Sequence, residues 1–186
     1  MKTIELKFNQ DLPGYTIVEE AKIIIELINA IDSSSILEAG AFTGKLTWSL
    51  CKTFLEKQIT ALDLFDGKSY VDRIGGRYHT TTRRDERYLN QTNTLEFFKN
   101  LQSEHTNVNT IKLNFLNYTA YHDVIIISVD ANDVDWNKIY DRALSLNPKL
   151  IIGRHKWAHR SDVINSLNNY EHTNYDSGIY VLHKKL

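Results

Sequence analysis

The sequence predicts an α/β fold: a doubly wound, mostly parallel sheet closed by an antiparallel hairpin at the C-terminal end. Short apolar runs that end in polar residues or glycine alternate with segments whose apolar residues recur every three or four positions, which is the order of strands and helices in a parallel sheet. The first apolar run leads through a glycine loop into a helix, as at the ligand-binding edge of such sheets. The 186 residues contain no repeat and no low-complexity linker, so one domain over 1–186 is expected.

The first half of the chain predicts two helices and two strands. Thr16 and Glu19 have the form of a capping box, in which the hydroxyl accepts an exposed backbone N–H and the carboxylate reaches back. After Gly44, apolar residues recur every four positions, as expected of a helix packed on a sheet. The elements predicted here are, in order, a helix at 17–31, a strand at 36–40, a helix after Gly44 and a strand at 59–63.

The second half predicts the centre of the sheet and its closing hairpin. Residues 123–130 are rich in β-branched side chains and flanked by polar residues, so we expect a central strand buried on both faces. Residues 170–184 alternate weakly around the turn signal Asp176-Ser-Gly178, which favours an antiparallel hairpin. The remaining predicted elements are helices at 93–103, 135–146 and 161–167, with Asn93 and Glu96 as a cap of the first, and strands at 109–115 and 149–153.

Composition excludes several classes of protein. The 22 basic and 23 acidic residues give a net charge of −1, so no overall field attracts the chain to nucleic acid or to an anionic membrane. Cys51 is the single cysteine, so neither a disulfide nor a zinc-binding cysteine pair is available. No stretch of roughly 18 apolar residues is present. We expect a soluble, cytoplasmic protein with no nucleic-acid or membrane partner, whose oligomeric state the sequence does not determine.

A glycine loop follows the first predicted strand, at residues 40–44. Ligands of open parallel sheets bind at the carboxyl ends of the strands, where the strand order reverses, and the loop occupies that place. A dinucleotide fingerprint that begins at Gly40 needs glycines at the positions of Phe42 and Lys45. These bulky side chains argue against a ligand with a pyrophosphate. Asp63 ends the next strand, near the offset of about 20 residues at which an acid meets ribose hydroxyls, although an exposed turn residue is the alternative.

The run Glu38-Ala-Gly-Ala-Phe-Thr-Gly44 resembles motif I of the class I S-adenosylmethionine-dependent methyltransferases, an acid and one spacer before Gly-x-x-x-Gly and a helix. The resemblance implies a Rossmann-like methyltransferase fold and S-adenosylmethionine as cofactor, with Glu38 anchoring the loop or the cofactor's amino group. The run Asp63-Leu-Phe-Asp-Gly67 resembles a stretch of the macrocin O-methyltransferase and cephalosporin hydroxylase-like branch, which places Leu64 beside adenine. The predicted cofactor-binding residues are Glu38, Gly40, Ala41, Phe42, Gly44, Asp63 and Leu64.

Asp130 and His155 follow neighbouring predicted strands, so we expect them to face one cleft as catalytic residues. Methyl transfer from a sulfonium needs an aligned nucleophile and a group that takes its proton, which a carboxylate or an imidazole can do. Further oxygen ligands follow Asp130 and would suit a divalent cation. The resembled branch has an acidic pair where this chain has Arg154-His-Lys156, so we predict no required metal. An exposed polar residue is the alternative interpretation of His155.

A polar insert at about 66–91 is too long for an ordinary turn and leaves the predicted sheet at its ligand edge, so we interpret it as a lid. Its arginines and tyrosines suit an anionic or aromatic group, and Tyr70, Arg83 and Arg84 are the predicted substrate-binding residues. A solvated loop whose charges pair with one another explains the same composition equally well.

The leading hypothesis is an S-adenosylmethionine-dependent methyltransferase that acts on an unidentified acceptor, either a small molecule or a group on a macromolecule, with a small and anionic acceptor favoured. Motif I does not distinguish this enzyme from a protein that binds the cofactor without transfer and has a regulatory or assembly role. A nucleotide-linked oxidoreductase or hydrolase is a third hypothesis. It is disfavoured by Phe42 and by the lack of phosphate-loop and nucleophile-elbow patterns in the sequence.

Overall fold

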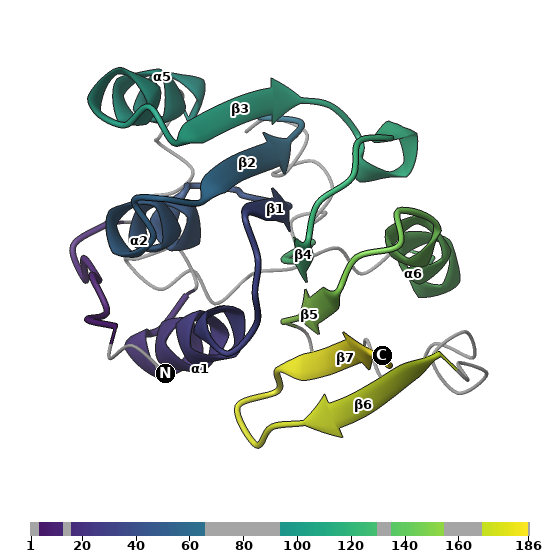
Figure 1. Cartoon of the computed structure of the whole chain (residues 1–186). Coiled ribbons are helices and arrows are strands. Elements are labelled where there is room, and N and C mark those ends of the chain that lie inside the picture. The colour runs from purple at the N-terminus through teal and green to yellow at the C-terminus, as the bar shows by residue number, and fades with distance from the viewer. Residues whose placement is uncertain (1–3, 13–15, 66–93, 130–134, 155–168, 186) are drawn as a thin grey trace, which may run out of the picture.

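A seven-stranded sheet forms the centre of the computed structural model, which describes residues 4–12, 16–65, 94–129, 135–154 and 169–185 (Figure 1). The strands lie in the order β3-β2-β1-β4-β5-β7-β6. The five strands from β3 to β5 are parallel, whereas β7 is antiparallel to both β5 and β6. This arrangement confirms the predicted fold class. The strands are Ser35–Ala39 (β1), Gln58–Asp63 (β2), Val108–Lys112 (β3), Val124–Ile127 (β4), Leu150–Gly153 (β5), Tyr170–Asn174 (β6) and Tyr180–Lys184 (β7).

Helices cover both faces of the sheet, as a doubly wound fold requires. The helices α1 (Val18–Asn29), α2 (Lys45–Thr53) and α5 (Thr94–Glu104) pack on one face. The helix α6 (Trp136–Ser145) and the 3-10 turn η1 (Phe115–Asn117) pack on the other. In the described parts of the chain, no helix has the length and apolarity needed to cross a membrane.

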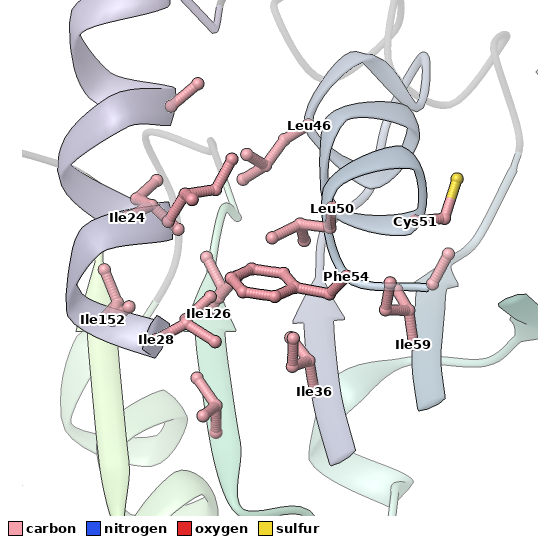
Figure 2. Close-up of a cluster of buried hydrophobic side chains, with 14 of the residues drawn as sticks. Ile24, Ile28, Ile36, Leu46, Leu50, Cys51, Phe54, Ile59, Ile126 and Ile152 are labelled. Atoms are coloured by element: carbon pink, nitrogen blue, oxygen red, sulfur yellow. The ribbon is translucent and has the colours of Figure 1, made fainter. Parts of the chain in front are cut away.

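Successive strand residues divide the core into two apolar layers. In β1, Ile36 belongs to the layer of α1 and α2, whereas Leu37 belongs to the layer of α6, because side chains along a strand alternate between faces. All of β4 is buried, and β4 is the fourth of seven strands, which confirms its predicted central position. Figure 2 shows the first layer, in which Ile24 of α1 and Leu50 of α2 lie over the sheet together with Phe54.

The parallel register aligns the carboxyl ends of the strands. Ile36 lies opposite both Ile59 of β2 and Val124 of β4, and Ile127 of β4 lies opposite Gly153 of β5. The residues that follow β1, β2, β4 and β5 therefore share one edge of the sheet, where ligands of such folds bind.

The predicted capping box at Thr16 is wrong. The helix α1 begins at Val18 with Ile17 as its N-cap residue, and no side chain caps it. Thr16 thus lies one residue too early, and its hydroxyl instead accepts a hydrogen bond from Arg154 at 2.9 Å. The Thr16 hydroxyl therefore makes a tertiary contact with Arg154 and does not cap the helix in the way that the local pattern predicts.

The other elements are present with bounds that differ by a few residues. The strand predicted at 123–130 ends earlier, at Ile127, and the strand predicted at 109–115 is Val108–Lys112. The helix predicted at 161–167 and the cap predicted at Asn93 lie outside the described residues.

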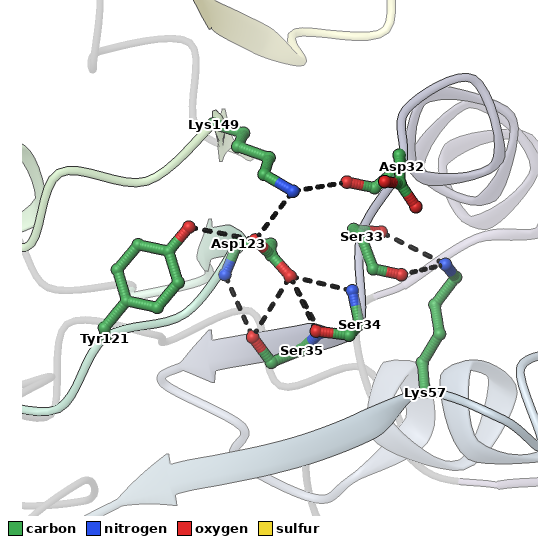
Figure 3. A network of polar contacts seen from close by, with 8 residues as sticks. All are labelled: Asp32, Ser33, Ser34, Ser35, Lys57, Tyr121, Asp123 and Lys149. Carbon is green, nitrogen blue, oxygen red and sulfur yellow. Dashed lines mark hydrogen bonds and ion pairs between the residues drawn. The ribbon is translucent and has the colours of Figure 1, made fainter.

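At the amino ends of the parallel strands, one buried carboxylate holds three elements together (Figure 3). Oδ2 of Asp123 accepts hydrogen bonds from the backbone N–H and the hydroxyl of Ser34, at 2.7 and 3.0 Å. Its Oδ1 accepts a hydrogen bond from the Tyr121 hydroxyl at 2.9 Å and pairs with the Lys149 ammonium at 3.0 Å. Lys149 also donates to the carbonyl of Asp32 at 2.6 Å. These contacts fix the turn between α1 and β1 against the starts of β4 and β5.

The partners of Asp123 determine its protonation. Burial by itself would raise the pKa of this carboxyl, but the hydrogen bonds from Ser34, Lys149 and Tyr121 outweigh burial and hold the pKa well below its usual range. The group is therefore ionised in the folded protein at all but strongly acidic pH.

Replacing Asp123 by Ala should destabilise the fold by about 3 kcal/mol, because buried donors and a cation lose their acceptor. Urea unfolding at pH 7 measures this loss, and Asp141→Ala, which removes an exposed carboxylate on α6, is the matched control. The pKa of Asp123 is lower in the folded chain than in the unfolded chain, so its contribution is complete above about pH 4 and is lost as the pH falls further. If Asp123→Ala and Asp141→Ala lowered the free energy of unfolding equally at pH 7, the stabilising role of Asp123 would be contradicted.

Candidate functional site

The loop between β1 and α2 lies at the carboxyl edge of the sheet, where the strand order reverses between β1 and β4. Gly40 has a φ of 88°, and a Cβ added to it would lie 2.8 Å from the backbone nitrogen of Val129 and 2.9 Å from the carbonyl carbon of Ser128. Only glycine permits this approach to the residues that follow β4. At the other end of the loop, Gly44 has a φ of 80° and is the N-cap residue of α2.

The carboxylate of Asp63, at the end of β2, supports two strained residues. Its Oδ2 accepts the backbone N–H of Phe42 at 2.9 Å, and its Oδ1 accepts that of Phe65 at 3.0 Å. Both phenylalanines have positive φ, 49° and 47°, a conformation that costs a non-glycine residue about 1–2 kcal/mol. Strained residues of this kind cluster at ligand-binding sites. Asp63 therefore shapes the loop directly, a role that its position in the sequence does not reveal.

The side chain of Glu38 is buried at the base of the loop, with 1% of its surface exposed. Thr47, in the first turn of α2, donates its hydroxyl hydrogen to Oε2 at 2.5 Å, and Ser128 donates to Oε1 at 3.4 Å. Burial raises the pKa of Glu38 to about 7, because these hydroxyls and the nearby Arg154 offset only part of the lost hydration. The carboxyl therefore changes its charge near neutral pH.

Arg154, which follows β5, connects this carboxyl to the start of α1. Its Nη1 donates to the Ser128 hydroxyl at 3.2 Å, and its Nη2 donates to Thr16 at 2.9 Å and to Glu20 at 3.0 Å. The side chains of Arg154 and Glu20 are only 11% and 17% exposed. We refer to the set as the Glu38–Arg154 network, which consists of Thr16, Glu20, Glu38, Thr47, Ser128 and Arg154.

The sequence predictions missed Thr47, Ser128 and Arg154 as parts of the site. A period-two pattern could have found two of them. Ile126 and Ile152 belong to the core layer of α1 and α2, so the residues two positions further along each strand, Ser128 and Arg154, face the same side. No comparable pattern indicates Thr47, because its partner is 9 residues earlier in the chain, across the loop.

The N-terminal segment, residues 4–12, lies along α2. The backbone N–H of Lys7 donates to the Thr53 hydroxyl at 3.1 Å. Lys45, directly after the loop, donates to a backbone carbonyl of the segment at 3.3 Å, and its ammonium lies 5.1 Å from the centre of the Phe8 ring. The Lys45 charge is thus directed toward this segment.

The structure brings most of the predicted cofactor-binding residues to one edge of the sheet. Leu64 follows Asp63 there and is partly exposed, but its predicted contact with adenine stays a prediction, as does ribose binding by Asp63. The predicted catalytic and substrate-binding residues and the insert lie outside the described residues, namely Asp130, His155, Tyr70, Arg83, Arg84 and 66–91.

Among the residues that the structure describes, no group of three or more His, Cys, Asp or Glu side chains could hold a metal ion. The stretch from Asp130 to residue 134, whose oxygen ligands would suit a divalent cation, is not among them. The expectation that the protein needs no metal therefore stays a prediction.

Several methyltransferases of known structure share this fold. A methyltransferase from Geobacter sulfurreducens has a TM-score of 0.58 at 9% identity, over 92% of this chain and 80% of its own. A putative O-methyltransferase from Nostoc punctiforme PCC 73102 has a TM-score of 0.60 at 10% identity, over 89% of this chain and 56% of its own. A putative caffeoyl-CoA O-methyltransferase from Staphylococcus aureus has a TM-score of 0.57 at 16% identity, over 93% and 86%.

No model of a known protein family matches the sequence, and no curated protein matches it. At identities of 9 to 16%, the structural likeness concerns the fold. The chain therefore has the Rossmann-like fold of class I methyltransferases, as the resemblance in motif I implied.

Replacing Glu38 by Gln should raise the free energy of unfolding at pH 8 by up to about 3 kcal/mol. At pH 5 the same substitution should change the free energy of unfolding little. The pKa of Glu38 is higher in the folded chain than in the unfolded chain, so the native protein loses stability as the pH rises from near 4.5 to about 7. The amide carries no charge and avoids this loss. Urea unfolding at both pH values tests the expectation, with Glu56→Gln, an exposed carboxylate after α2, as control. A stability change that is the same at both pH values would show that Glu38 is not the titrating group.

Proposed function

We propose that this chain is an S-adenosylmethionine-dependent methyltransferase that acts on a small, anionic acceptor. The observation that carries the proposal is the loop from Gly40 to Gly44, which at Gly40 packs against the backbone just after β4, at the reversal of strand order. A buried acid lies at the base of this loop and a second acid ends β2 beside it. The methyltransferases of known structure that share the fold support the proposal.

The side chains at the loop suit S-adenosylmethionine better than a dinucleotide. Each oxygen of Asp63 accepts one backbone N–H and has a further lone pair, with which it can accept a ribose hydroxyl. A sulfonium cation is attracted to the carboxylates of Glu38 and Asp63, whereas the two negative charges of a pyrophosphate would be repelled by them. The charges of these carboxylates and the bulk of Phe42 and Lys45 therefore both argue against a dinucleotide.

In the proposed enzyme, the bound cofactor supplies an activated methyl group, and the residues of the chain position it. Gly40 and Gly44 shape the loop that carries it, and Asp63 orients its ribose. Asp130 and His155 are proposed to take the proton of the acceptor as the methyl group moves. Tyr70, Arg83 and Arg84 are proposed to hold an anionic acceptor, because arginine forms paired hydrogen bonds with carboxylate and phosphate groups. Within the class I fold, the run 63–67 favours the macrocin O-methyltransferase and cephalosporin hydroxylase-like branch.

Titration calorimetry on the full chain should show binding of S-adenosylmethionine and of S-adenosylhomocysteine and no binding of NAD. Asp63→Asn should weaken both affinities by about 1–3 kcal/mol, since it replaces a charged acceptor by an amide. Asp141→Asn, an exposed substitution on α6, should leave them unchanged. Binding of NAD alone would overturn the proposed function, and an unaltered affinity in Asp63→Asn would remove Asp63 from the ribose site.

Asp130→Asn and His155→Ala should leave the affinity for S-adenosylmethionine nearly unchanged and should lower methyl transfer by about 10²-fold or more, because each removes a proposed proton acceptor. Methyl transfer is measured with a labelled donor over a panel of carboxylate, phosphate and phenol acceptors. Turnover that survives both substitutions would refute the catalytic assignment. Tight binding without turnover of any acceptor would favour a protein that binds the cofactor without transferring its methyl group.

A further inference from the structure

The Glu38 carboxyl lies where the charge of a ligand can act on it. Glu38 is two residues before Gly40, and two residues of extended chain span about 7 Å. Its oxygens accept hydrogen bonds from Thr47 and Ser128, and the loop lies against the backbone of Ser128 at Gly40. A ligand that rests on the loop is therefore separated from the carboxyl by little more than the loop backbone. Buried charges at such separations are screened much less than exposed ones.

In the described parts of the chain, the charged groups near Glu38 come from four elements and carry both signs. Arg154, after β5, favours the ionised carboxyl, whereas Asp63, at the end of β2, opposes it. Arg154 is itself paired with Glu20 of α1 at 3.0 Å. Lys45 of α2 directs its ammonium toward the N-terminal segment. Within the described parts of the chain, the hydrogen bonds to the Glu38 carboxyl come from hydroxyls and none comes from a cation.

This arrangement leaves the carboxyl close to the balance between its two protonation states. Burial opposes the charge, and the hydroxyls of Thr47 and Ser128 together with Arg154 favour it, so the pKa is about 7. A modest additional field is then enough to change the charge of the group at neutral pH. A ligand that brings one positive charge to the loop supplies such a field.

Resting on the proposed function, we propose that Glu38 distinguishes S-adenosylmethionine from its demethylated product. The carboxyl releases its proton when a sulfonium lies on the loop and keeps its proton when the ligand is a neutral thioether. No bond of the ligand forms or breaks in this step, and the proton passes to the solvent. The two ligands share adenine, ribose and amino-acid groups, so they differ at the loop by a methyl group and its single positive charge. The ionised carboxylate strengthens binding of the donor, and loss of that charge on methyl transfer weakens the attraction to the product.

The expected effect is measurable. A unit charge about 10 Å away in a partly buried site shifts the pKa of an acid by about one unit. Because the free protein must lose a proton to bind the cation well, the affinity for S-adenosylmethionine should rise about tenfold as the pH rises from 5.5 to 8. The affinity for S-adenosylhomocysteine should change much less over the same range.

Calorimetry of the full chain at pH 6.5, in two buffers with different enthalpies of ionisation, counts the protons that each ligand releases. We expect release of about half a proton with S-adenosylmethionine and close to none with S-adenosylhomocysteine. In Glu38→Gln the two ligands should release equal numbers of protons, because the amide does not titrate. In Glu56→Gln, the exposed control, the difference between the ligands should persist. Circular dichroism verifies that each variant is folded.

Equal proton release by the two ligands in the unaltered chain overturns this inference while leaving the proposed function intact. A difference that survives in Glu38→Gln assigns the proton to another group and also overturns it. If neither ligand binds, the proposed function fails together with the inference. If Glu38→Gln does not fold, the affinities of the unaltered chain for the two ligands between pH 5.5 and 8 still test the inference. An equal pH dependence of the two affinities would overturn it.

Discussion

The close approach of Gly40 to the backbone that follows β4 is the constraint on which the carboxyl edge of the sheet depends. It brings the loop within van der Waals distance of Val129 and of Ser128, whose hydroxyl donates to the buried Glu38 carboxyl. It also directs the chain across the end of β2, where Asp63 accepts the N–H of Phe42. A bulkier residue at position 40 would collide with the backbone of Ser128 and Val129 and push the loop away from them.

The two ends of the sheet each contain a buried carboxyl group, and their surroundings shift its pKa in opposite directions. At the amino ends, Asp123 has backbone, hydroxyl and ammonium partners that hold its pKa low. At the carboxyl ends, Glu38 has two hydroxyl partners, and burial raises its pKa to about 7. The first group is fully satisfied and serves stability. The second accepts hydrogen bonds from hydroxyls alone, which do not offset its burial, and an acid with a perturbed pKa of this kind is a candidate for a functional site.

The fold could be predicted from the sequence because each element has a local period. The buried run of β4, the glycine turn after β1 and the weakly alternating C-terminal hairpin are all visible as spacing of apolar residues and glycines. The place of the candidate site in the fold came from the same reasoning, since glycine loops and strand ends have fixed places in such sheets. The contacts within the site did not follow. Thr16 illustrates why: its local pattern indicated a helix cap, but Arg154, 138 residues away, binds its hydroxyl. Pairings across that distance leave no local period to detect.

The strand β7, which follows β6 in the sequence, has an inner place in the sheet. β7 lies between β5 and β6, and its Val181 and Leu182 are fully buried. During synthesis, β5 and β6 are both complete before the strand that joins them exists. Until then the outer edge of β5 has unpaired backbone groups beside apolar side chains, the kind of edge that promotes association between unfinished chains. A ribosome-bound chain can therefore form the sheet from β3 to β5 before β7 has been made, and that edge is covered only when β7 pairs with β5.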